Sequence, residues 1–148
     1  MKNILFRYLL VVFIIAGCSS DAIKGSYFTF ADKQWKRFEN PEIEFDISKP
    51  GIFYNMWLEV DYDASLAPET LPVTVIMYTP SGEVRSRTLN LKFKDQNENN
   101  RDGKFRVMLR KDFAFSEKGS CSFEFENRSQ DIKTPGMIRI GIVLEKGI

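Results

Sequence analysis

Residues 42–62, EIEFDISKPGIFYNMWLEVDY, hold two segments in which apolar and polar side chains alternate. The first, Glu42–Ile47, is apolar at every second position, and the second, residues 52–62, is apolar at its even-numbered positions. A period of two is the pattern of a β-strand with one buried face. Between the two segments, residues 48–51 (SKPG) are typical turn formers. The stretch therefore predicts two strands joined by a short turn.

The same period continues along the rest of the chain, and no window of a dozen residues has the 3.6-residue period of an amphipathic helix. Further strands are expected over residues 72–78, 83–93, 104–110, 121–126 and 137–146. About seven or eight strands at this spacing are typical of a sandwich. We therefore expect one all-β domain over residues 27–148, an antiparallel β-sandwich that is Ig-like or jelly-roll-like, with most aromatic side chains in its core.

One expected strand departs from the alternating pattern. Val84 would face inward on even-numbered positions, whereas Leu89, Leu91 and Phe93 occupy odd-numbered positions. A β-bulge, or a strand that passes from one sheet to the other, would account for this change of phase. The sequence therefore predicts an irregular strand over residues 83–93.

The N-terminus has the pattern of a secretory signal peptide. Two basic residues flank a short polar start, and the apolar run YLLVVFIIA at 8–16 is about half the ~20 residues that a membrane-spanning helix needs. The run ends in Ile-Ala-Gly-Cys18, which is similar to the lipobox of bacterial lipoproteins. We therefore predict a lipoprotein signal peptide over residues 1–17, lipid on Cys18 and a flexible tether over residues 18–26. The alternative is an ordinary signal peptide with an incidental cysteine.

Histidine is absent from the 148-residue chain, and only two cysteines are present. Without histidine, Ser-His-Asp and Cys-His catalysis are excluded and the commonest neutral metal ligand is missing. Removal of the signal peptide would leave 19 basic and 20 acidic side chains, a balance that does not predict nucleic acid as a partner. The sequence therefore predicts a protein without enzymatic activity, cofactor or metal. With Cys18 lipidated, Cys121 is expected to be a small buried apolar residue.

Basic residues are concentrated in two successive expected strands. Arg85 and Arg87 share one face of the first, and Lys104, Arg106 and Arg110 share one face of the second. If these strands pair, the side chains form a basic stripe that fits an acidic partner or anionic lipid headgroups. The alternative is an exposed sheet face whose charges pair within the molecule.

Two tryptophans and a pair of carboxylates are further candidates. Trp35 precedes the first firm strand, and Trp57 lies on the more polar face of the strand at 52–62. An exposed tryptophan can stack on a sugar ring or anchor a protein interface, whereas a buried one belongs to the core. Glu42 and Glu44 lie about 7 Å apart on one strand face and could serve glycoside hydrolysis, although a solvent-facing strand has the same pattern.

Several segments together resemble one protein family. They are the lipobox at Cys18, the early Trp35, the YNMWLEV segment at 54–60, the YTPSG hairpin at 78–82, and the ending at 115–145 with its GSCSFEF and PGMIRIGIVLE motifs. This layout is similar to GldH, the gliding-motility-associated lipoprotein family of the Bacteroidota. The resemblance covers roughly residues 27–146 and rests on strand and turn patterns rather than on a chemical signature.

The resemblance implies a small outer-membrane lipoprotein that supports an assembly of the cell envelope without catalysis. It offers no catalytic motif to transfer, and Arg128 in the last loop is the one polar position that matches the pattern. The leading hypothesis is a non-enzymatic, lipid-anchored protein that acts through protein–protein contacts, with the periplasmic face of the outer membrane favoured over the cell surface. The alternative is a polysaccharide-binding β-sandwich that uses Trp35 or Trp57.

Overall fold

The computed structural model describes residues 23–93, 100–101 and 103–147. This part of the chain forms one 3-10 turn, η1 (Ala31–Lys33), and three short strands, β2 (Gln34–Lys36), β7 (Asn100–Arg101) and β10 (Lys133–Pro135). It also forms eight longer strands: β1 (Ile23–Thr29), β3 (Glu42–Ile47), β4 (Phe53–Tyr62), β5 (Thr70–Tyr78), β6 (Val84–Lys92), β8 (Lys104–Ala114), β9 (Gly119–Asn127) and β11 (Met137–Lys146). No helix in the described ranges is long and apolar enough to cross a membrane.

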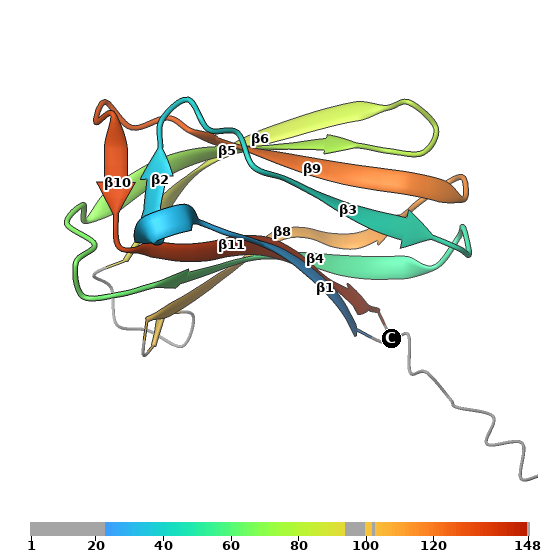
Figure 1. Ribbon diagram of the computed structural model, residues 1–148. Coiled ribbons are helices and arrows are strands. Elements are labelled where there is room, and N and C mark those ends of the chain that lie inside the picture. The colour runs from blue at the N-terminus through green and yellow to red at the C-terminus, as the bar shows by residue number, and fades with distance from the viewer. Residues whose placement is uncertain (1–22, 94–99, 102, 148) are drawn as a thin grey trace, which may run out of the picture.

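The strands form two large antiparallel sheets packed face to face, as the sequence predicts (Figure 1). One sheet has the order β1-β11-β4-β8-β7, and the other has the order β3-β9-β5-β6. The long strands pair in a nested way, β1 with β11, β3 with β9, β4 with β8 and β5 with β6, as if one long hairpin had been folded over on itself. This nested pairing is the jelly-roll topology, so of the two sandwich types expected, the jelly-roll-like one is correct.

The core lies between the two sheets and is built by alternate residues of each strand. In β4, β5 and β9 every second side chain is buried, which confirms the period of two read from the sequence. Cys121 is fully buried among these residues, as expected. The largest fully buried side chains are aromatic or aliphatic: Trp35, Phe115, Phe123, Phe125, Leu58 and Leu71. A dense aromatic core of this kind provides most of the stability of a small sandwich.

A small third sheet closes one end of the sandwich. It consists of β2 and β10, which stand across the gap between the two large sheets (Figure 1). Trp35 on β2 is completely buried, its ring stacks on Phe30 at a centroid distance of 5.2 Å, and its indole N–H donates to the Glu39 carbonyl at 2.8 Å. Trp35 is therefore a core residue that plugs this end.

Two expectations from the sequence were wrong. The first strand begins at Ile23, so residues 23–26 belong to the sheet and not to the flexible tether. The strand at 83–93 contains no bulge, because β6 pairs with β5 in continuous register from Val84 to Lys92. Val84 simply faces outward with 58% of its surface exposed, and Arg85 and Arg87 occupy the inward-facing positions before Leu89.

The irregularities lie in β8 instead. Its register with β4 shifts on both sides of the pair formed by Met56 and Arg110, and Asp112 has a positive φ of 51°. Each bulge adds one residue to β8 and so turns the following side chains to the opposite face. As a result Arg110 lies opposite the buried Met56, whereas Arg106 stays on the outer face of the sheet.

Candidate functional site

Arg106 lies at the centre of a charged and aromatic cluster on the outer face of the five-stranded sheet. Its guanidinium stacks over the Trp57 ring, with the guanidinium carbon 4.2 Å from the ring centroid. Its Nη2 donates to Glu145 at 3.0 Å, and its Nε lies 3.4 Å from Glu59. The charge of Arg106 is therefore countered by carboxylates from two neighbouring strands, β4 and β11, which matches the alternative of intramolecular pairing.

A second cation extends this cluster along the same face. Arg139 donates from Nε to Asp61 at 2.6 Å, and its guanidinium carbon lies 4.0 Å from the centroid of the Tyr27 ring. The Tyr27 hydroxyl donates to Glu59 at 2.7 Å, which links the two arginines through one carboxylate. We call these seven side chains the outer-face network: Tyr27, Trp57, Glu59, Asp61, Arg106, Arg139 and Glu145.

Packing holds the outer-face network against the sheet. Tyr27 lies over Gly141, where a Cβ atom would come within 2.4 Å of the tyrosine ring and 2.3 Å of the Ser26 carbonyl oxygen. Val143, which pairs with Trp57, is only 5% exposed although it faces outward. Burial, and next the hydrogen bond to Glu59, raise the pKa of Tyr27 to about 12. The network is thus a packed layer in which the charged groups are paired within the molecule, although the Trp57 indole N–H and Arg106 Nε have no hydrogen-bond partner among the described residues.

The two tryptophans do not form an open sugar-binding platform. Trp35 is buried in the core, where no saccharide can reach it. Trp57 is half-buried, and one face of its ring is already covered by Arg106. Stacking on a sugar needs an exposed ring face, so this geometry does not favour the platform hypothesis.

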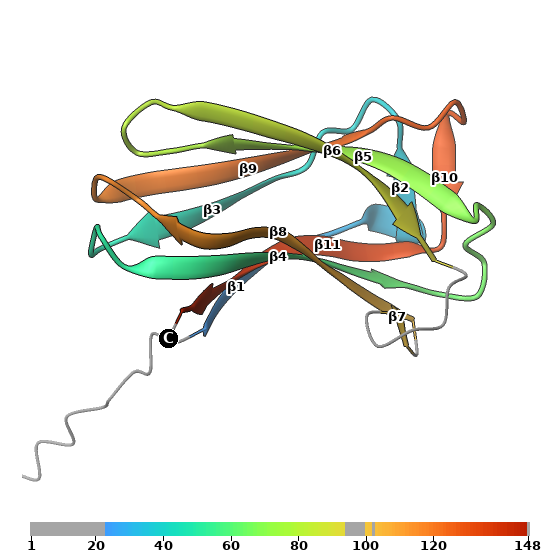
Figure 2. The same cartoon turned by 180° about the vertical axis from the view of Figure 1, so that it is seen from behind.

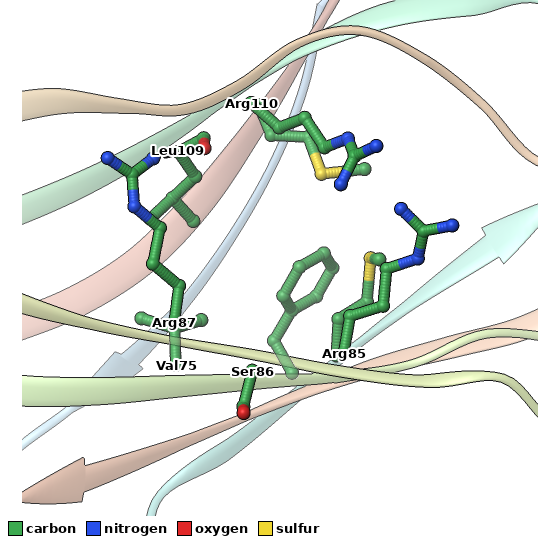
Figure 3. A pocket seen from close by; sticks show the side chains of 9 residues that line it. Val75, Arg85, Ser86, Arg87, Leu109 and Arg110 are labelled. Atoms are coloured by element: carbon green, nitrogen blue, oxygen red, sulfur yellow. Dashed lines mark hydrogen bonds between the residues drawn. The ribbon is translucent and has the colours of Figure 1, made fainter.

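A different arrangement lies on the side of the sandwich where β6 and β8 run along the edges of the opposing sheets (Figure 2). Between these strands is a cleft of about 180 Å³. Its floor is apolar and includes Met56, Met77 and Phe123, which come from β4, β5 and β9. Three arginines line its mouth: Arg85 and Arg87 from β6 and Arg110 from β8. We call this site the edge cleft (Figure 3).

The arginines of the edge cleft have few anionic partners. Arg85 pairs with Glu83 at 2.6 Å, which is its neighbour on the same strand. Arg87 donates from Nη1 to the Leu109 carbonyl on β8 and so bridges the two sheets at the mouth of the cleft. Within the described part of the chain, neither Arg87 nor Arg110 forms an ion pair with a carboxylate. Among the described residues, therefore, only one of the three guanidinium groups has a carboxylate partner.

An aromatic ring positions two of these guanidinium groups. The guanidinium carbons of Arg85 and Arg110 lie 5.3 Å and 5.2 Å from the centroid of the Phe113 ring. These two side chains thus meet on one side of the edge cleft, and Arg87 lies on the other (Figure 3). Cation–π attraction to a shared ring offsets part of the repulsion between the two like charges.

The basic stripe expected from the sequence does not form. It required the strands that carry Arg85, Arg87 and Arg106 to pair, but β6 and β8 belong to opposing sheets. Arg106 points away from the interior, and the β8 bulge brings Arg110 to the edge cleft in its place. Arg110 was expected to share a face with Arg106. No sequence signal marks a bulge at this point, so spacing alone could not identify the third arginine.

The remaining candidates are dispersed. Glu42 and Glu44 are exposed on the outer face of β3, where Glu44 accepts a hydrogen bond from Ser120. Burial raises the pKa of the Cys121 thiol to about 12, which keeps it protonated near neutral pH. The described residues contain no group of three His, Cys, Asp or Glu side chains that could hold a metal ion. The predicted signal peptide at 1–17 and the predicted lipidation site Cys18 lie outside the residues that the structure describes.

Comparison with known proteins identifies the family. A search of the curated proteins found no match. The family model described as GldH lipoprotein matches residues 22–144. The match covers all the long strands of the sandwich except the last two residues of β11. A match over this share of the chain shows membership. The chain therefore belongs to the GldH lipoprotein family.

Proposed function

We propose that this lipoprotein is held at the outer membrane by lipid on Cys18 and binds other envelope proteins there without catalysing a reaction. Membership of a lipoprotein family and the Ile-Ala-Gly-Cys18 sequence at the end of the apolar run support the anchor. Strand β1 begins at Ile23, so only a few residues would separate the lipid from the folded domain. The domain would therefore act close to the membrane surface, and we favour the periplasmic face.

The edge cleft is the observation that carries the binding role. It combines an apolar floor with three arginines, of which only Arg85 forms an ion pair with a carboxylate in the described part of the chain. Arginine beside apolar and aromatic surface is typical of residues that dominate protein interfaces. The outer-face network, by contrast, already uses its charges internally.

A role without catalysis is supported by the chemistry of the side chains. The sequence contains no histidine, and Glu42 and Glu44 are exposed on the outer face of β3. The Cys121 thiol is buried and held in its protonated form. A polysaccharide-binding role loses support because Trp35 is buried and Trp57 is partly covered by Arg106.

The proposed function is tested by crosslinking the full-length lipoprotein inside the cell, followed by affinity capture and mass spectrometry. A Cys18→Ser variant serves as the unanchored control, and a clickable fatty acid fed to the cells reports lipid attachment. We expect lipid on the wild-type protein only, and a discrete set of envelope proteins that the Cys18→Ser variant does not capture. Recovery of polysaccharide without protein, or the same captured set without the anchor, would refute the proposal.

A further inference from the structure

We propose that the edge cleft binds an extended, acidic segment of a partner protein, which adds as a strand to β6 and inserts one large apolar side chain between the sheets. This inference rests on the proposed function and specifies the chemistry of its partner. It combines three properties of one place on the molecule: the size of the cleft, the charge at its mouth and the edge strand beside it.

The size of the cleft fits a side chain rather than a lipid. Its volume of about 180 Å³ is close to the roughly 150 Å³ of an apolar cavity that holds a benzene ring. A floor of Met56, Met77 and Phe123 suits a phenylalanine, leucine or methionine side chain, because sulfur and aromatic groups pack closely against such residues. A long acyl chain would need more space than this.

The charge at the mouth selects a carboxylate next to that side chain. Arg87 uses Nη1 for the Leu109 carbonyl, which leaves Nε and Nη2 without a described partner. Arg110 has the Phe113 ring beside it but no carboxylate partner among the described residues. Guanidinium groups with free donors bind carboxylates in a bidentate manner, and the apolar surroundings strengthen such pairs.

The edge strand supplies the backbone hydrogen bonds. β6 is nine residues long, and in the described part of the chain it pairs only with β5, on one side. An edge strand presents alternate N–H and C=O groups to a further strand, which is the basis of strand addition. In an added strand, residues opposite Arg85 and Arg87 would face the mouth of the cleft, since directly paired residues share a face. A segment whose acidic and apolar residues both occupy every second position would carry them on the same face. They would therefore meet the arginines and the cleft together.

The test measures binding of blocked synthetic peptides to the full-length lipoprotein in detergent micelles by fluorescence anisotropy. The probe has the alternating pattern Glu-Thr-Phe-Thr-Glu, and matched peptides replace both Glu by Gln or Phe by Ser. We expect the probe to bind at least tenfold more tightly than either matched peptide and to weaken as salt is added. Equal binding of all three peptides would overturn the proposal. The proposal would also be wrong if the protein did not bind the probe and instead bound a fatty acid that can be displaced from it.

Variants of the protein localise the site. Arg87→Gln removes the charge and keeps a polar side chain, and it is combined with Arg110→Gln. We expect this pair to weaken probe binding at least tenfold, with an unchanged thermal unfolding midpoint. Arg106→Gln is the matched control on the outer face and should leave binding unchanged. Loss of binding with Arg106→Gln but not with the double variant would place the site elsewhere.

Backbone methylation of the probe separates strand addition from simple docking of side chains. Two isomers carry N-methyl groups on alternate residues, one on the odd and the other on the even positions. An added strand uses the N–H groups of only one edge, so one isomer should lose binding and the other should retain it. Equal binding of the two isomers would refute strand addition.

The same variants used in the cell distinguish this inference from the proposed function. If wild-type protein captures discrete envelope proteins and the Arg87→Gln/Arg110→Gln variant does not, both proposals are supported. If the variant captures the same proteins as the wild type, the partners bind elsewhere and only the inference about the edge cleft is wrong. If the wild type captures no protein, the proposed function itself is wrong.

Discussion

The outer-face network and the edge cleft contain the same kind of side chain in opposite situations. On the outer face, Arg106 and Arg139 bind three carboxylates, Glu59, Asp61 and Glu145, and each guanidinium stacks on an aromatic ring. At the edge cleft, only one of the three arginines, Arg85, pairs with a carboxylate in the described part of the chain. The comparison shows that the number of basic residues on a strand says little about where a partner binds. What matters is whether the fold has already supplied the counter-charges.

The two regions should therefore respond differently to substitution. Removing part of the outer-face network breaks interactions that exist in the folded protein, so the free energy of unfolding should fall. Removing an arginine from the edge cleft breaks few internal contacts, so stability should change little while binding is lost.

The largest effect is expected for Trp57→Ala. The substitution removes a half-buried ring that covers Val143 and supports Arg106, and we expect the free energy of unfolding to fall by about 2–3 kcal/mol. Chemical denaturation measures this loss. Trp57→Phe should restore much of it, because the indole N–H is buried without a hydrogen-bond partner among the described residues. Equal loss in the Phe and Ala variants would contradict the packing role.

A smaller effect is expected for the ion pair between Arg106 and Glu145. Both side chains are about two-fifths exposed, at 40% and 42%, so solvent screening limits the pair. A double-mutant cycle with Arg106→Gln and Glu145→Gln should give a coupling energy of about 0.5 kcal/mol, which should decline in high salt. The same cycle on Arg110 and Glu83 should give no coupling. A coupling there as large as on the outer face would remove the contrast between the two regions.

The smallest effect concerns alkaline pH. The pKa of Tyr27 rises from 10.0 to about 12 on folding, first through burial and then through the Glu59 hydrogen bond, so the folded state retains a proton that the unfolded state releases. Its contribution to stability is complete below pH 10 and is lost as the pH rises through about 12. Tyr27→Phe should therefore lose less stability than the wild type over this window. Cys121 contributes equally to both proteins. Parallel curves would show that Tyr27 does not titrate in this way.

Much of the fold could be predicted from the sequence because its determinants are local. The period of two in β3 and β4 gives the buried face of each strand directly, and the SKPG and TPSG segments give the turns. The alternation pattern was misleading where charged residues occupy inward-facing positions. Arg85 and Arg87 hold inward-facing positions of β6 at the open edge of the sandwich, where long side chains keep their charged ends in water. The apparent change of phase in this strand therefore comes from these two arginines and not from a bulge.

By itself the sequence determined the all-β class and the buried face of most strands. It also contains the lipobox-like segment and the motifs of the family resemblance. Each of these depends on neighbouring residues or on alternation along one strand. Only the tertiary structure decided which arginines are neutralised. The partners of Arg106 and Arg139 lie 39 and 78 residues away, and a bulge in β8 decides which face Arg110 occupies. Pairing between distant strands and a one-residue change of phase depend on the packing of the whole sandwich. Spacing along the chain does not encode them, so the edge cleft appears only in the folded molecule.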